Sequence, residues 1–169
     1  MSQAKKKVLF HLPIPIDFGS YNGTQGRVLG VLKYLRDRKD FFEVDAIGGN
    51  KFGIPEWGSA QKKEILNFVN NVFVYEGERN LFDFLYTRSQ SFYHQKLLRQ
   101  QLPVDSDYFA PPGYVKFLGN LISQKKYDFL WINNLDYAHL AAKKFAQVPT
   151  IIDMHDITSR FRLVRKNIP

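Results

Sequence analysis

The residues best suited to acid–base chemistry lie near the end of the chain, where an apolar segment is followed by Asp153, a methionine, His155 and Asp156. An imidazole titrates near neutral pH, and a neighbouring carboxylate can orient its ring. His155 and Asp153 are therefore the candidate catalytic residues. Two alternatives stay open: Asp156 is the N-cap of a following helix, and His155 is a hydrogen-bonded residue in the wall of a site.

A second group of polar side chains follows the apolar run at residues 129–132. Asn133, Asn134 and Asp136 come directly after that run. If both runs are strands of one parallel sheet, their carboxyl ends meet at the same edge and their polar side chains converge on one cleft. We therefore expect these three residues to bind a polar ligand.

The third candidate is a loop rich in proline and glycine at residues 13–26, between the apolar run 8–12 and the amphipathic segment 27–38. Backbone N–H groups at the start of a helix bind anions, which makes Gly23, Thr24 and Gln25 candidate binding residues, with Thr24 as the expected N-cap. The glycines do not follow G-x-G-x-x-G, and the G-K-[ST] ending of a P-loop is missing. The alternative is a connection whose glycines only make turns.

The other histidines do not indicate a metal site. His11 lies within the first apolar run and is interpreted as a core or edge residue, while His94 and His139 are interpreted as surface or packing residues. Their spacing matches no metal-binding motif, so the sequence predicts no protein-bound metal.

Composition sets broad limits on the class of protein. The chain has 169 residues, 44% of them hydrophobic and 15% aromatic, which favours a single domain over 1–169 with one good core. The absence of cysteine excludes disulfides and a thiolate nucleophile, and fits a reducing cytoplasm. A net charge of +8 indicates an anionic partner or a solvated basic face. No nucleic-acid-binding motif is present, so we expect no nucleic acid partner.

The apolar periodicity predicts strands that alternate with helices. Strands are expected at 8–12, 42–47, 72–75, 129–132 and 150–152, and Gly48, Gly49 and Asn50 are expected to form a turn. Helices are expected at 27–38, 60–68, 81–101 with a break near 89–91, 114–123, 138–145 and 157–166. The alternation predicts an α/β fold with a doubly wound, Rossmann-like parallel sheet covered on both faces.

The segment 81–99 combines aromatic and basic side chains. It contributes either to the core or to a peripheral contact with an anionic membrane. With no signal peptide or membrane span in view, the chain is expected to be cytoplasmic, with a candidate contact at the inner face of the membrane.

Three stretches resemble one family of enzymes. The segments 7–12 and 23–27, with the leucine-rich helix that follows, resemble the opening of retaining GT-B glycosyltransferases of the family 4 type. Residues 127–134 are similar to the family's Asp-Val-Val-His-x-His stretch, and residues 148–156 to its Pro-Val-Val-x-Thr-x-His-Asp stretch. The likeness covers the whole chain as an N-terminal domain.

The resemblance implies one half of a GT-B fold that faces a C-terminal domain absent from this chain. That second domain would hold most of a nucleotide-sugar donor and carry the E-x7-E motif, while this one would face a glycan or lipid-linked acceptor, with no further cofactor. Gly23 and its neighbours would approach the donor diphosphate. Trp131 and Asn133 stand where many members have histidine, so no catalytic histidine is carried over to that stretch. The alternative function is a noncatalytic Rossmann-like module that binds a nucleotide or a protein. A third reading, a basic nucleic-acid-binding domain, lacks any recognisable RNA- or DNA-binding motif.

Overall fold

The protein is built on a five-stranded, all-parallel sheet. The computed structural model describes residues 4–19, 23–50, 57–77, 80–99, 110–134, 137–141 and 145–153, with Thr24 and Asn50 described by their backbone alone. The strands lie in the order β3-β2-β1-β4-β5. Their bounds are β1 Lys6–His11, β2 Phe42–Asn50, β3 Asn71–Glu76, β4 Phe129–Asn133 and β5 Thr150–Asp153.

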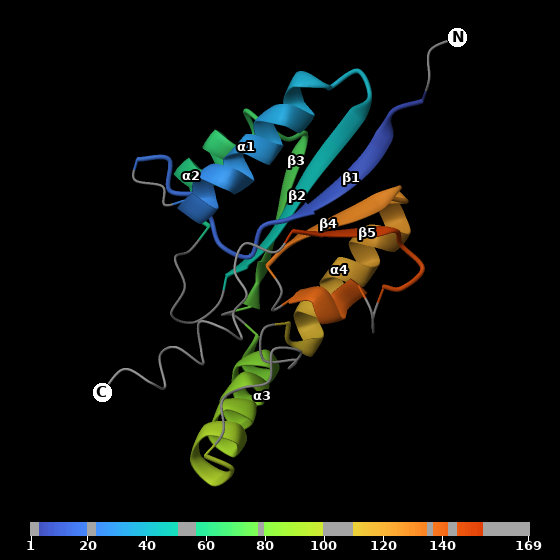
Figure 1. Cartoon of the computed structure of the whole chain (residues 1–169). Helices are drawn as coiled ribbons and strands as arrows, with labels where there is room; N and C mark the ends of the chain where they lie inside the picture. The colour runs from blue at the N-terminus through green and yellow to red at the C-terminus, as the bar shows by residue number, and fades with distance from the viewer. Residues whose placement is uncertain are drawn as a thin grey trace.

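Helices cover both faces of this sheet (Figure 1). On one face lie α1, Gly23–Asp37, and α2, Ser59–Ile65; on the other lies α4, Pro112–Lys125. The predicted α/β, Rossmann-like fold is therefore confirmed. Helical turns at 137–141 cover part of the predicted helix 138–145, and the predicted helix 157–166 lies outside the described residues.

Alternation along β1 divides the core into two clusters. Val8 and Phe10 pack with Leu29 and Leu32 of α1, whereas Leu9 belongs to the cluster on the α4 face. Val8, Leu9 and Phe10 are completely buried, because β1 is the middle strand and its side chains meet helices on both sides.

The helix α3, Leu81–Phe92, begins just after β3 and extends away from the sheet, and a π-helical turn, η2, Tyr93–Leu97, follows it (Figure 1). Asn80 caps α3 by accepting hydrogen bonds from the N–H groups of Phe82 and Asp83. The buried carboxylate of Asp83 accepts from Tyr75 Oη at 2.7 Å and from the N–H of Gly113 at 3.1 Å. One polar residue thus joins the base of α3 to β3 and to the first turn of α4.

Three local predictions are wrong. Gly48, Gly49 and Asn50 are not a turn, because β2 continues through them in register with Val74, Tyr75 and Glu76. Thr24 is not the N-cap of α1, because the helix already begins at Gly23.

The third concerns the strand predicted at 150–152, whose Ile151 and Ile152 should be buried if the sheet is covered on both faces along its whole width. They are 43% and 40% exposed, because β5 is the edge strand of the described sheet and β4 is its one neighbour there.

Candidate functional site

The strand order itself defines a place where a ligand can bind. From β1 the chain crosses to β2 on one side, and from β4 it crosses to β5 on the other. Neighbouring strands whose connections diverge in this way leave a crevice at their carboxyl ends, which is the usual ligand site of open α/β sheets. The ends of β1, β4 and β5 lie at this one edge, as the sequence predicted.

The amino end of α1 supplies the anion-binding part of this edge. The first N–H groups of an α-helix have no partner within the helix, and α1 has no acidic side chain in its first turn to accept from them. Gly23 is exposed, and a Cβ added to it would meet no atom of the described chain within 4 Å. Gln25, two residues on, is half-buried.

An ion pair connects α1 to the far strand. The guanidinium of Arg27 lies 3.1 Å from Oδ1 of Asp153, whose side chain is 9% exposed against 58% for Arg27. The carboxylate is therefore largely buried at the end of β5, while the cation above it remains open to solvent. This places a positive charge beside the amino end of α1, where the helix dipole is also positive.

Asn133 connects the ends of β4 and β1. Its Nδ2 donates to the carbonyl oxygen of His11 at 2.6 Å, and its Oδ1 is buried without a hydrogen-bond partner among the described residues. The next residue, Asn134, has a left-handed backbone with φ of 87° and donates its N–H to the carbonyl oxygen of Asp153 at 3.1 Å. The two asparagines therefore order the backbone where three strands end.

The floor of this edge is aromatic. The buried ring of His11 lies 4.4 Å from that of Tyr137 and 6.0 Å from that of Tyr114, centroid to centroid. Tyr114 also packs over the backbone of Gly49. Burial, with a smaller effect of Tyr137, raises the pKa of Tyr114 well above its usual value. These aromatic groups therefore pack together at the carboxyl end of β1.

The predicted site residues divide into three groups. Asp153, Asn133 and Asn134 lie at the strand ends, joined by the hydrogen bond between Asn134 and Asp153, and Gly23 and Gln25 lie in the first turn of α1. Thr24 is described by its backbone alone. Asp136 and His155 lie outside the described residues.

Sequence reasoning missed Arg27 as a site residue. Its spacing places it among the polar residues of an amphipathic helix, and nothing near it in the sequence indicates its partner Asp153. The available signal was a basic residue close to the start of a helix, where acidic residues are the favoured type.

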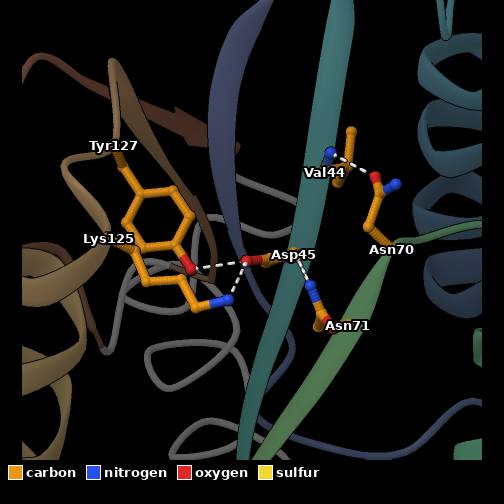
Figure 2. Close-up of polar contacts among 6 residues, drawn as sticks. All are labelled: Val44, Asp45, Asn70, Asn71, Lys125 and Tyr127. Carbon is orange, nitrogen blue, oxygen red and sulfur yellow. Dashed lines mark hydrogen bonds and ion pairs between the residues drawn. The ribbon is translucent and has the colours of Figure 1, made fainter.

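A second buried carboxylate lies near the opposite edge of the sheet and has a structural role. Asp45 accepts from Tyr127 Oη and from Asn71 Nδ2, each at 2.7 Å, and Lys125 Nζ lies 3.7 Å away (Figure 2). The hydrogen bond to Asp45 adds to burial in raising the pKa of Tyr127 far above its usual value. This cluster joins β2, β3 and the segment before β4, and its polar groups are directed at one another.

Two negative findings apply to the described ranges. Within them, no three histidine or carboxylate side chains gather in a way that could hold a metal ion. No helix there is both long and apolar enough to cross a membrane.

The sequence matches no known family model, and the search of curated proteins found no significant relative.

Proposed function

We propose that this chain is the acceptor-side domain of a retaining glycosyltransferase, which moves a sugar from a nucleotide-sugar donor to a glycan or lipid-linked acceptor. The proposal joins the sequence resemblance to the geometry of the carboxyl edge. The observation that carries it is the convergence of the amino end of α1, Arg27 and the ends of β4 and β5 at the crossover of a parallel sheet.

This edge suits a leaving group of two or more phosphates. Cleavage of the donor places negative charge on the diphosphate, and helix N–H groups with a nearby guanidinium stabilise such charge without a metal. Among the described residues, no atom comes within 4 Å of a Cβ added at Gly23, which leaves room there for phosphate oxygens to approach closely. Arg27 would then contact the diphosphate while Asp153 holds its side chain in place.

The asparagines at the end of β4 would contact sugar hydroxyls. An amide can both donate and accept, as a hydroxyl requires, and Oδ1 of Asn133 has no partner in the described part of the chain. Asp136 and His155 complete the proposed set, with His155 and Asp153 as the candidate catalytic pair. A second Rossmann-like domain would supply most of the donor contacts.

One observation favours a second candidate, a noncatalytic module that binds a nucleotide. The carboxylate of Asp153 is held by Arg27 at 3.1 Å, an arrangement that suits a positioning role better than proton transfer. The two candidates share the anion-binding edge and differ in whether the sugar is transferred.

Calorimetric titration with a panel of nucleotide sugars tests the proposal, together with a transfer assay on the enzyme that carries this domain. We expect this chain alone to show no transfer and only weak binding, because half of an interdomain cleft offers half of the contacts and each 1.4 kcal/mol lost weakens binding about tenfold. Submicromolar binding by the chain alone would mean that the donor site is assigned to the wrong half. Binding without transfer by the complete protein would favour the noncatalytic module.

A further inference from the structure

The helix α3 extends away from the sheet (Figure 1), and, unusually for such a helix, its outer face is apolar. Leu81, Leu85 and Phe92 are spaced to fall on one side of the helix, with Phe82 beside them. Their exposed fractions are 68%, 56%, 58% and 65%. The inward residue is instead polar, since Asp83 is 3% exposed and bonded to Tyr75 and Gly113. The helix therefore presents its hydrophobic side to solvent.

This apolar surface extends beyond the helix in both directions. At the far end, Tyr93 and Leu97 of η2 are 50% and 63% exposed. At the near end, Leu81 and Phe82 also line a cleft of about 580 Å³, together with Val74 and Phe117. We call the exposed residues of α3 and η2, with this cleft, the α3 surface. Contiguous apolar surface of this kind marks an interaction site.

Most charged side chains at the α3 surface are positive. Arg88 and Lys96 of this surface, and Arg99 just after η2, are exposed, whereas Asp83, the single acidic residue in the stretch 80–99, is buried and hydrogen-bonded. One exposed carboxylate, that of Glu76, lines the cleft, and it lies 3.9 Å from Lys62 Nζ. The whole chain carries a net charge of +8. The partner that complements this surface is therefore both apolar and anionic.

We propose that the α3 surface docks the protein on an anionic lipid bilayer. Leucine and aromatic side chains with flanking cations are the pattern of a helix that lies in the membrane interface, with its apolar face among the acyl chains and its cations at the headgroups. A second copy of this chain fits less well, because pairing through the same surface would bring three cations against three, and Glu76 is the one described carboxylate that is exposed in this surface. The inference goes beyond the proposed transfer reaction and does not depend on it.

Vesicle flotation with the purified chain tests the proposal. We expect the protein to float with vesicles of phosphatidylcholine and phosphatidylglycerol, to bind vesicles of phosphatidylcholine alone at least about tenfold more weakly, and to be released by salt. No nucleotide sugar is present in this experiment, so a failure to bind vesicles would not bear on the proposed sugar transfer. In the same way, a failure to transfer sugar would not bear on membrane docking.

Matched variants test whether the α3 surface is responsible. The double variant Leu85→Gln/Phe92→Gln should lower partitioning at least about tenfold, a difference of about 1.4 kcal/mol. The control Leu66→Gln/Phe41→Gln changes two residues that are 49% and 59% exposed elsewhere and should partition like the wild type. Lys96→Glu should weaken binding about fivefold or more, and Lys33→Glu on α1 should not. Circular dichroism melting of each variant checks that it is folded.

Several results would overturn the proposal. The first is that the protein does not bind the anionic vesicles, and the second is that it binds neutral vesicles equally well. The third is that the α3 variants and their controls lose vesicle binding to the same extent. Sedimentation equilibrium without lipid adds another: a dimer that Leu85→Gln/Phe92→Gln abolishes would make the α3 surface a contact between copies.

Discussion

Arg27 and Asp153 form the contact on which the account of the edge most depends. They are far apart in the sequence, and their ion pair joins the first helix to the edge strand. The carboxylate is nearly buried and the guanidinium is largely exposed. Exposed ion pairs contribute little to stability, whereas removal of one partner from a buried pair costs several kcal/mol. The contribution of this pair to stability should therefore lie between these two limits.

A double-mutant cycle on Arg27→Gln and Asp153→Asn should give a coupling energy of about 1 kcal/mol in urea unfolding. The matched cycle on Arg36 and Asp37, an exposed pair 2.9 Å apart at the other end of α1, should give less than about 0.5 kcal/mol. Equal coupling energies in the two cycles would mean that the Arg27–Asp153 pair contributes no more to stability than an exposed pair.

Gly23 and Gly30 provide a second residue-scale test, because both are exposed on α1 and a Cβ at either would meet no atom of the described residues within 4 Å. Gly23→Val and Gly30→Val should each change stability by less than about 1 kcal/mol. If the chain belongs to the proposed glycosyltransferase, Gly23→Val in the complete protein should cut turnover strongly, because its side chain would occupy the proposed place of the diphosphate, while Gly30→Val should not. Near-wild-type turnover in Gly23→Val would show that the segment is only a connection.

At this scale the sequence predicted strand-end residues better than helix residues. Asn133, Asn134 and Asp153 follow apolar runs directly, and parallel pairing brings such ends to one edge. Arg27 was missed because its role depends on where β5 lies, and no local pattern in the chain contains that information.

Among the elements, β2 shows how tertiary contacts override local signals. Two glycines and an asparagine usually make a turn, yet a Cβ on Gly48 would lie 2.5 Å from the ring nitrogen of Trp57. The glycines let Trp57 and Tyr114 pack directly on the strand, and pairing with β3 keeps it extended. Trp57 lies outside the Gly-Gly-Asn pattern and Tyr114 is remote in sequence, so the extension of β2 could not be predicted from the local residues.

The attachment of α3 gives an element-scale prediction. A Cβ at Gly113 would collide with Tyr75 Oη and lie 2.5 Å from Oδ2 of Asp83, so Gly113→Ala should destabilise the protein by about 1–3 kcal/mol and loosen α3. Gly119 lies on α4, as Gly113 does, and a Cβ added there would touch the ring of Phe145 at 3.4 Å. Gly119→Ala should therefore be neutral or stabilise the protein by up to about 1 kcal/mol. Thermal melting compares the two, and equal melting temperatures would contradict the described role of Asp83.

For the whole molecule, the division into two cores on a parallel sheet was predictable, because alternating strand and helix periodicities have few other solutions.

The same packing buries several tyrosine hydroxyls. Burial, with the hydrogen bond to Asp83, raises the pKa of Tyr75 to about 12, and burial also raises the pKa values of Tyr114 and Tyr127 well above the usual value.

These shifts predict the alkaline stability of the fold. An unfolded tyrosine loses its proton near pH 10 while the folded one keeps it, so the stabilisation is complete below about pH 10 and declines as the pH rises toward about 12. Urea unfolding across this range should show the decline, and Tyr127→Phe should make it shallower. Tyr34→Phe, which removes an exposed hydroxyl, should leave the slope unchanged. A pH-independent midpoint would contradict the burial of these hydroxyls.

The central claim is that the carboxyl edge at α1 binds a diphosphate. Titration of the isotope-labelled chain with uridine diphosphate, guanosine diphosphate and pyrophosphate, followed by nuclear magnetic resonance, tests it most directly. We expect the backbone amides of residues 23–27 to shift with added ligand and the amides around Asp45 to stay unchanged. We also expect Arg27→Gln to weaken the response and Arg36→Gln to leave it intact. Shifts confined to other parts of the chain, or an equal response in the two arginine variants, would contradict the claim.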